Sequence, residues 1–391
     1  MSPVKHFSQI LEQTLRLAYD GGGFSSLPFD DRIPSLVSKI LEKMNLAPEQ
    51  PRFFFFDKDD ATVFFLKKNC VVILVGKIGE GGFKTVKKGF LASENAREGI
   101  QLAVAIEMEP HDARISDEFT CSQEIQKRPI RGIAEVFETT LAEMPNGKYH
   151  RVYLHPFYNG GDLHNYVTRL KMHQLDSSKL ERRNIQYQLI RALIALAKRG
   201  YIHRDLKQEN VVLHHRPNGT TRVLVIDFGH MKNTQSPTFS DVAPCQGSIP
   251  YLPPEIAELA ILWKCLPEGE TKNQERRRVV TPKLDVWGIG SILLSIENKD
   301  LFLNIFCQKK NDKRNPVIVC IRESLDSEFP EPEDKDSVLH LIWLMLRRDP
   351  QERVPPNREL EERFCSSVLK ELDHDANLSS RSEETPPTHS R

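Results

Sequence analysis

The chain has 391 residues, of which 39% are hydrophobic and 28% charged, and its 54 Lys and Arg residues balance its 54 Asp and Glu residues. This composition predicts a globular protein with one large two-lobed domain and extensions, or with two ordinary domains. The neutral balance argues against nucleic acid or an anionic membrane as the main partner.

The chain carries no evident targeting or membrane signal. Residues 1–13 lack the apolar core of a secretory signal, and the longest apolar runs, such as Val71–Val75, are too short to span a bilayer. Seven scattered cysteines without a CxxC pair favour reduced thiols over a disulfide or zinc framework. We therefore expect a cytoplasmic protein without a membrane span, and export by another route stays open. Its oligomeric state is not readable from the sequence.

The first fifty residues predict two amphipathic helices. Apolar side chains recur at helical spacing in residues 4–18, and a second such stretch begins at Pro34. We expect residues 1–50 to form a small helical extension that packs on the main domain. A regulatory or docking helix pair is the alternative.

The pattern then changes to strands, with apolar runs between Phe53 and Ile106, and becomes mostly helical after about Leu163. A strand-rich first part followed by a helical second part predicts an α+β fold. The polar, proline-containing end of the chain predicts a disordered tail over residues 371–391.

A series of short motifs carries the chemistry. The most specific is HRDLKQEN at 203–210, and it is followed by DFG at 227–229, GSIPYLPPE at 247–255, DVWGIG at 285–290 and Arg353. Two apolar runs around an Asn-Gly turn separate the first two motifs and predict a β-hairpin. Each motif alone is weak, whereas five in this order form a specific signal.

In this order the motifs resemble those of eukaryotic-type protein kinases, over about residues 71–369. The resemblance implies a kinase domain over 51–370, with a strand-rich N-lobe near 71–156 and a helical C-lobe near 160–370. It also implies that ATP and Mg²⁺ bind in the cleft between the lobes.

The resemblance assigns a role to each motif residue of the second part. Phosphoryl transfer depends mainly on positioning and on charge neutralisation. Asp205 would accept the proton of a Ser or Thr hydroxyl on a protein substrate, and Lys207 would meet the γ-phosphate. Asn210 and Asp227 would bind Mg²⁺ through hard oxygen ligands. Ser248 would lie beside the substrate hydroxyl.

Three further residues would support this centre by resemblance. Asp285 would brace the catalytic loop, and Glu255 would pair with Arg353 to anchor the activation segment.

The nucleotide-binding residues are expected in the first part. GEGGFKTV at 79–86 resembles the glycine-rich loop that covers ATP phosphates, with Lys84 in place of the third glycine. Candidate nucleotide-binding residues are Ile78, Gly79, Gly81, Lys84, Val86, Ala105 and, for the ribose, Asp162.

One departure from the family concerns its strand lysine. After Val104-Ala105-Ile106 the chain has Glu107, where kinases carry the lysine that holds ATP phosphates. No lysine occurs between Lys88 and Lys127, so a shift of register cannot restore one.

Lys84 is the candidate replacement. Because side chains alternate along a strand, Lys84 shares the face of Val86, while Lys88 lies roughly 13 Å further along. The string FKTV at 83–86 also resembles the with-no-lysine (WNK) kinases, which are active with a lysine in this loop. We expect Glu124, on the following helix, to pair with Lys84, and Lys84 to lie between the carboxylates of Glu124 and Glu107.

Two functions stay open from the sequence. One is an active serine/threonine kinase with a relocated lysine, and the other is a catalytically weak or inactive pseudokinase that acts as a binding or scaffold module. The intact Asp205, Asn210 and Asp227 favour the first. The Ser and Thr residues of 230–246 are either phosphorylation sites or an ordinary loop. Residues 264–283 predict a solvated loop, with a substrate-docking insert as the alternative.

Overall fold

The structure, a computed structural model, describes residues 3–20, 33–45, 50–56, 61–67, 69–95, 100–109, 117–172, 177–235, 248, 251–262, 280–306, 325 and 327–383. The chain forms two compact units. The first comprises Met1–Pro129 and Ala134–Tyr158, and the second comprises Ile130–Ile133 and Asn159–Arg391.

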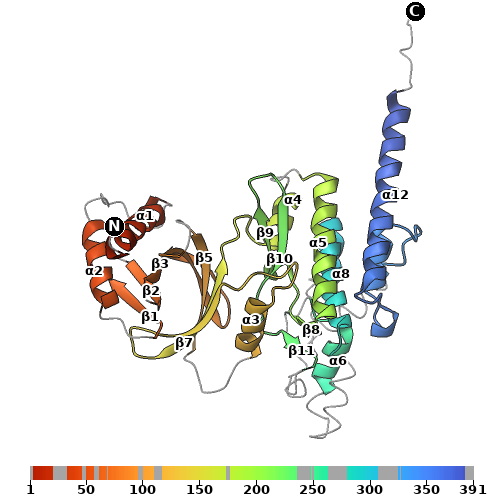
Figure 1. The fold of residues 1–391 in the computed structure, drawn as a ribbon. Helices are drawn as coiled ribbons and strands as arrows, with labels where there is room; N and C mark the ends of the chain where they lie inside the picture. Colours follow the sequence, from red (N-terminus) through yellow and green to blue (C-terminus); the bar gives the residue numbers. More distant parts are fainter. Residues whose placement is uncertain are drawn as a thin grey trace, which may run out of the picture. The chain divides into compact units, whose positions relative to one another are not determined.

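Seven strands of the first unit close into a barrel in the order β1-β2-β3-β4-β5-β7-β6 (Figure 1). Neighbouring strands are antiparallel, except that β1 meets β6 in parallel where the barrel closes. The strands are β1 (Arg52–Phe56), β2 (Ala61–Lys67), β3 (Cys70–Glu80), β4 (Lys84–Ser93), β5 (Ile100–Glu107), β6 (Glu138–Glu143) and β7 (Tyr149–Pro156). Helix α3 (Asp117–Lys127) lies between β5 and β6 in the chain.

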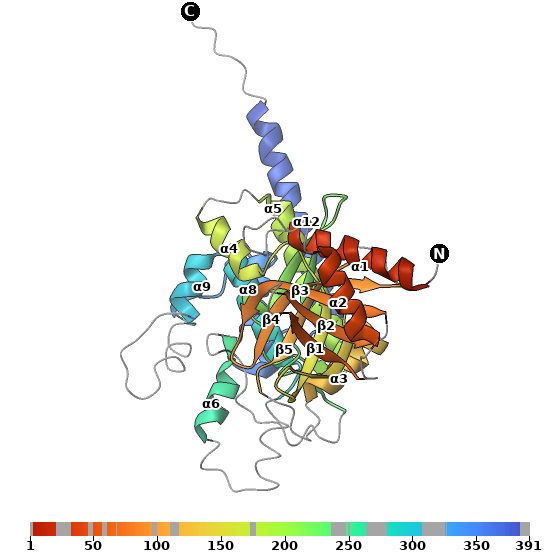
Figure 2. The ribbon, with the colours of Figure 1, turned by 90° about the vertical axis from the view of Figure 1, so that its left-hand side faces the viewer.

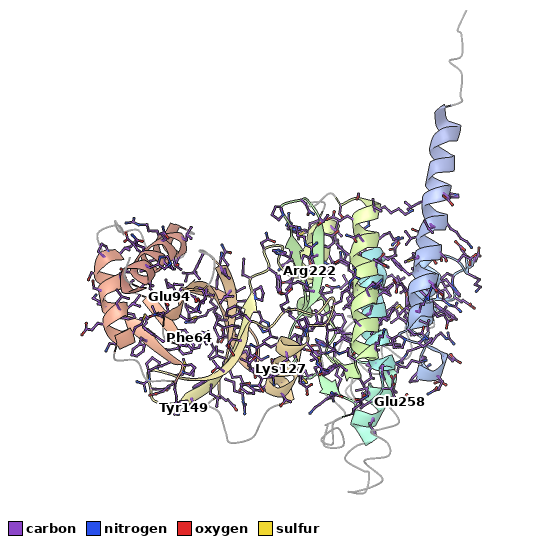
Figure 3. The ribbon with its side chains drawn as sticks, viewed as in Figure 1. Phe64, Glu94, Lys127, Tyr149, Arg222 and Glu258 are labelled. Atoms are coloured by element: carbon purple, nitrogen blue, oxygen red, sulfur yellow. The ribbon has the colours of Figure 1, made fainter. Side chains whose placement is uncertain are left out.

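Alternation of side chains gives the barrel two apolar faces. One face forms a buried cluster that includes Phe53, Phe64, Val72 and Val104. Figure 3 shows Phe64 among the strands, and its ring stacks on that of Phe53 with centroids 4.4 Å apart. The residues next to them along the strands point the other way. The second face therefore also needs a cover.

Helices α1 (Pro3–Asp20) and α2 (Ile33–Asn45) pack on this second face (Figure 2). Leu11 and Leu15 of α1 are fully buried, and they join one cluster with Leu36 of α2 and with Ile73 and Ala92 of the strands. The expected helical extension is thus present, with its apolar face packed on the strands.

The second unit is mostly helical. Its long helix α5 begins at Ser178, whose hydroxyl caps the helix by accepting a 3.0 Å hydrogen bond from the Glu181 amide. The helices are α4 (Leu163–Lys171), α5 (Lys179–Lys198), α6 (Pro254–Leu262), α8 (Lys283–Glu297), α9 (Lys299–Phe306), α11 (Val338–Met345) and α12 (Arg358–Glu383).

The second unit also contains two small sheets. Strands β9 (Val211–His215) and β10 (Thr221–Val225) form the expected hairpin, and Gly219 has the positive φ of 79° that its turn requires. Strand β8 (Tyr201–Ile202) pairs with β11 (Lys232–Asn233).

The expected α+β fold, strand-rich and then helical with helices at the N-terminus, is confirmed. One boundary differs, because α12 continues to Glu383 where a disordered tail was expected from residue 371. Glu, Leu and Lys are strong helix formers and dominate residues 368–372, so the helix is not interrupted there. Residues 384–391 lie outside the described part of the chain.

A buried guanidinium joins three helices of the second unit. Arg183 of α5 is 5% exposed and binds Glu297 of α8, with Nη2 2.9 Å from Oε1, and Glu371 of α12, with Nε 2.9 Å from Oε2. Burial would raise the pKa of Glu297, but the hydrogen bond and charge of Arg183 outweigh it and hold that pKa below its usual value. Figure 1 shows α12 beside α5.

Replacing Arg183 by Met should therefore destabilise the second unit by about 3–5 kcal/mol, because Glu297 loses its cation and Glu371 keeps only Lys179, whose Nζ is 3.7 Å from Glu371 Oε2. Urea unfolding followed by circular dichroism measures the loss. Arg358→Met is the matched control, since its pair with Glu362 is exposed, and it should cost no more than about 0.5 kcal/mol. Equal unfolding midpoints for the two variants would contradict this account.

Candidate active site

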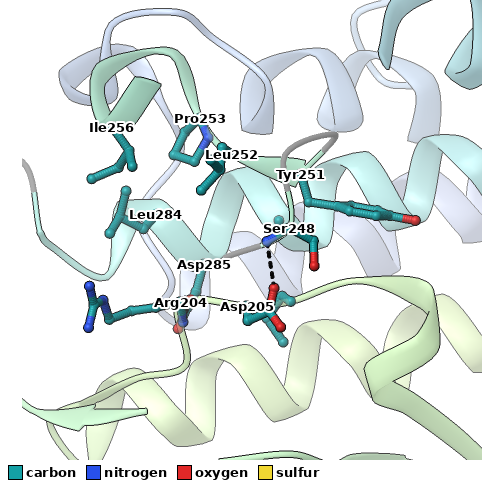
Figure 4. Close-up of a pocket in the computed structure, with 11 residues that line it drawn as sticks. Arg204, Asp205, Ser248, Tyr251, Leu252, Pro253, Ile256, Leu284 and Asp285 are labelled. Carbon is teal, nitrogen blue, oxygen red and sulfur yellow. Dashed lines mark hydrogen bonds between the residues drawn. The ribbon is translucent and has the colours of Figure 1, made fainter. Parts of the chain in front are cut away.

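The loop between β8 and β9 holds Asp205 in a dense set of hydrogen bonds. The Ser248 amide donates to Asp205 Oδ1 at 2.8 Å (Figure 4). Lys207 Nζ donates to Asp205 Oδ2, also at 2.8 Å. Asn210 Nδ2 donates to the same Oδ2 at 3.1 Å and to the Asp205 carbonyl at 2.8 Å. Lys207 Nζ also donates to the Ser248 hydroxyl at 2.8 Å. The four residues form one connected group.

These contacts determine the charge of the carboxylate. Asp205 is 6% exposed, and burial alone would raise its pKa. The hydrogen bond and charge of Lys207, together with the Ser248 bonds, outweigh burial and hold the pKa of Asp205 below its usual value. The carboxylate is therefore ionised near neutral pH and able to accept a proton.

A second buried carboxylate, that of Asp285, binds the backbone of this loop. Asp285, in the first turn of α8, accepts hydrogen bonds from the amides of His203 at 2.7 Å and Arg204 at 2.9 Å. Burial raises the pKa of Asp285. Arg204 has a φ of 70°, a left-handed conformation that is uncommon for a residue with a side chain. The bracing expected of Asp285 agrees with these two bonds, which hold Arg204 in this conformation.

A backbone hydrogen bond brings the segments of Asn210 and Asp227 together. The Ile226 amide donates to the Asn210 carbonyl at 2.9 Å, and Asp227 is the next residue after Ile226. Asp227 also has a positive φ, of 65°, and its Oδ1 accepts from the Gly229 amide at 3.3 Å.

The donor chemistry of this pair fits a magnesium ion. The Asn210 amide group donates to Asp205, which turns its oxygen toward other partners, and Asp227 adds a carboxylate. Oxygen donors are the ligands that Mg²⁺ prefers, and it usually takes only one or two carboxylates from the protein. Among the described residues there is no group of three or more His, Cys, Asp or Glu side chains that could hold a metal ion. A metal here would therefore need ligands from a phosphate or water.

Glu255 and Arg353 form the expected ion pair. Both Arg353 Nη atoms lie 2.6 Å from Glu255 oxygens, and the guanidinium lies over the Trp287 ring at 4.9 Å. Arg353 is 1% exposed. The pair links the start of α6 to the segment before α12.

A small cavity of about 20 Å³ lies beside the loop between β8 and β9 (Figure 4). Its lining combines Asp205 and Ser248 with the side chains of Tyr251, Leu252 and Ile256.

Most of the candidate phosphorylation sites are not covered by the structure. Ser236, Thr238 and Ser240 lie outside the described residues, as does most of the 264–283 insert. Thr234 is described, and its hydroxyl donates to the Gly200 carbonyl at 2.9 Å.

In the first unit, strand register determines which side chains share a face. Val86 lies directly opposite Ala105, and Lys84 lies directly opposite Glu107. Directly opposed residues of antiparallel strands point to the same side. Lys84, Val86, Ala105 and Glu107 therefore share one face, as the alternation predicted.

The carboxylate that Lys84 contacts is not at the expected position. Lys84 Nζ forms an ion pair with Glu118 in the first turn of α3. Glu124, six residues later, is exposed. Six residues turn an α-helix by about 600°, so Glu118 and Glu124 lie on different faces. Glu118 shares the inward face with Cys121 and Ile125 at helical spacing, a signal that the sequence did contain.

Glu107 also has a partner that sequence reasoning missed. Arg151 Nη1 lies 3.0 Å from Glu107 Oε2, and the Tyr153 hydroxyl donates to Oε1 at 2.7 Å. Both residues come from β7, where alternation puts them on one face. Lys84 Nζ lies over the Tyr153 ring, 5.4 Å from its centroid. We expected Lys84 to lie between the carboxylates of Glu107 and Glu124. The structure instead has two ion pairs, one of Lys84 with Glu118 and one of Arg151 with Glu107.

The remaining nucleotide candidates have varied surroundings. The Gly81 amide donates to the Lys84 carbonyl at 2.9 Å and closes the turn, and a Cβ added at Gly79 or Gly81 would meet nothing within 4 Å. Ile78 is 48% exposed. Asp162, expected at the ribose, caps α4 in the second unit through a 2.7 Å bond from the Asn165 amide and a 2.9 Å bond from its side chain.

None of the described helices is long and apolar enough to cross a membrane.

Comparisons with known proteins give the same family as the motifs. The protein kinase domain family matches residues 73–365. A protein of Schizosaccharomyces pombe named negative regulator of sexual conjugation and meiosis is 33% identical over 141 residues, covering 35% of this chain and 28% of its own. Human serine/threonine-protein kinase MAK is 25% identical over 205 residues, 46% of this chain and 29% of its own.

The mouse dual specificity protein kinase TTK is 28% identical over 177 residues, covering 44% of this chain and 18% of its own length. The matches thus cover well under two thirds of these relatives. Since the family match extends over well more than half of the present chain, the chain belongs to the protein kinase family.

Proposed function

We propose that the protein transfers the γ-phosphate of ATP to serine or threonine hydroxyls of protein substrates. The observation that carries the proposal is the hydrogen-bonded group of Asp205, Lys207, Asn210 and Ser248. It supports a carboxylate that is ionised, fixed in direction and next to a cation. A transferase that positions a hydroxyl against a phosphate needs these properties.

The transfer can be written with these residues. The substrate hydroxyl oxygen attacks the γ-phosphorus and gives its proton to Asp205, while the bond from that phosphorus to the bridging oxygen breaks and ADP leaves with the electron pair. Lys207 neutralises charge on the moving phosphoryl group. Asn210 and Asp227 would hold Mg²⁺, which supplies further positive charge to the phosphates when bound.

Lys84 is the proposed phosphate-binding lysine of the first unit. Its side chain is 17% exposed and lies on the same face as Val86 and Ala105, which would contact the adenine. The ion pair with Glu118 would orient the ammonium group of Lys84, which is the role that the sequence predicted for Glu124. Ile78, Gly79 and Gly81 would complete the cover over the nucleotide. Asp162 would have to give up its capping bonds to reach a ribose.

Specificity for Ser and Thr is supported by Lys207, which matches the serine/threonine branch of the family. A second candidate function is a pseudokinase that serves as a binding module. Glu107 favours it, because this carboxylate stands where the family has a lysine.

Replacing Asp205 by Ala should lower phosphate transfer by about 10² to 10⁴-fold, because the hydroxyl loses its base in the transition state. The assay is transfer of radiolabelled phosphate from Mg·ATP to the protein itself and to a generic basic substrate. Asp300→Ala is the control, since Asp300 is exposed and pairs with Lys171. Undiminished transfer by Asp205→Ala would overturn the assignment, and no transfer by the wild type with any metal would favour the pseudokinase.

Replacing Asp227 by Ala should weaken Mg²⁺-dependent ATP binding, because the metal loses its carboxylate ligand. Thermal shift with ATP, with and without Mg²⁺, measures the change. The wild type should gain extra stability when Mg²⁺ accompanies ATP, and the variant should lose that gain. If both proteins respond equally to the metal, Asp227 does not bind it.

Replacing Lys84 by Met should reduce transfer by a factor of about 10² to 10³, as expected when a positioned phosphate-binding charge is removed. Lys88→Met should have a mild effect, because Lys88 lies over the Phe157 ring, 4.6 Å from its centroid, and further from the loop. Initial rates at saturating substrate compare the two. Wild-type transfer by Lys84→Met would rule out the relocated lysine.

A further inference from the structure

The first unit contains two carboxylates that compete for one lysine. Lys84 and Glu107 lie directly opposite each other on β4 and β5. Opposed residues of this kind have Cβ atoms about 4.5–5.5 Å apart, close enough for an ion pair across the strands. A Lys84–Glu107 pair would compete with the Lys84–Glu118 pair that orients the ammonium group for a phosphate, and it would add a second negative charge beside that phosphate.

Arg151 removes Glu107 from this competition. Both Glu107 carboxylate oxygens are occupied, one by Arg151 Nη1 at 3.0 Å and the other by the Tyr153 hydroxyl at 2.7 Å. The Glu107 carbonyl lies 2.7 Å from His150 Nδ1, which holds the end of β5 against β7. The carboxylate is thus bound from the β7 side, and Lys84 pairs with Glu118 on α3.

Burial strengthens this arrangement. The side chain of Arg151 is 9% exposed and that of Glu107 is 16% exposed, so water screens their attraction only weakly. Tyr153 is 1% exposed, and its ring lies beneath Lys84 Nζ and in edge contact with Phe119, with centroids 6.4 Å apart. An aromatic face attracts an ammonium group without neutralising its charge.

We propose that Arg151 is a positioning residue: by holding Glu107, it keeps this carboxylate away from Lys84 and leaves Lys84 available to ATP phosphates, which rests on the proposed role of Lys84. Loss of Arg151 then matters because it releases Glu107, and removal of the Glu107 charge should reverse the loss. At the strand position where the family has a lysine, this chain has Glu107, and Arg151 is the cation that pairs with it.

The experiment is a double-mutant cycle in the full chain, read by titration with the fluorescent analogue TNP-ATP. Arg151→Met should weaken binding roughly tenfold, since the released Glu107 carboxylate would pair with Lys84 and repel the phosphates of the nucleotide. Glu107→Gln should bind within about threefold of the wild type, and Arg151→Met with Glu107→Gln should return to that range. A purely structural Arg151 would give a double variant no better than Arg151→Met.

Arg52→Met is the matched control, because Arg52 also pairs with a glutamate of the barrel, Glu143, at the closing strands. It should leave TNP-ATP binding unchanged, while its melting temperature reports the cost of losing a barrel ion pair.

Unchanged binding in Arg151→Met, or no recovery in the double variant, would overturn the role of Arg151. A wild type that binds no TNP-ATP would overturn it as well. If the cycle behaves as expected but no protein is phosphorylated, Arg151 keeps its role and the transferase function fails. If the wild type transfers phosphate and the cycle is flat, only the role of Arg151 is lost.

Discussion

The two hydrogen bonds that Asp285 accepts from the His203 and Arg204 amides are the constraint on which the centre of the second unit depends. A buried carboxylate without donors is costly, so the bonds are strongly favoured once α8 places Asp285 there. They hold Arg204 at its positive φ, and the chain then turns so that Asp205 meets Ser248 and Lys207. The geometry of the proposed base thus begins with a residue eighty positions later in the chain.

Ion pairs between an arginine and a partly buried glutamate occur in both units. Glu255 has Arg353, Glu297 and Glu371 share Arg183, and Glu107 has Arg151. Each of these acids pairs with an arginine, whose planar fork suits a carboxylate and whose hydration is weaker than that of a lysine, and Glu371 also has Lys179. Lys84 and Lys207 also pair with acids, Glu118 and Asp205, and each would in addition face a phosphate in the proposed reaction.

The exchange of lysine for Glu107 has a further consequence for the first unit. A lysine restored at this position by a single substitution would lie against Arg151, and two cations would then share a buried site. The usual arrangement of the family therefore requires at least two changes here. The pair of Glu107 with Arg151 and the pair of Lys84 with Glu118 are best understood as one alternative set of ion pairs.

Several features followed from the sequence alone because they are local. The alternation of side chains gave the shared face of Lys84 and Val86, the Asn-Gly turn gave the hairpin of β9 and β10, and the order of motifs gave the grouping of Asp205, Lys207 and Asn210. Each depends on spacing within a strand, a turn or a short loop, which the chain fixes without reference to distant residues.

The partners of the charged groups were decided by tertiary structure. Glu118 replaced Glu124 because the packing of α3 determines which helical face meets the barrel, and spacing from Glu107 along the chain does not contain that rotation. Arg151 is 44 residues from Glu107 and reaches it because β7 pairs with β5. The sequence determined which side chains are acidic and which are basic, whereas the packing of strands and helices decided which of them form ion pairs.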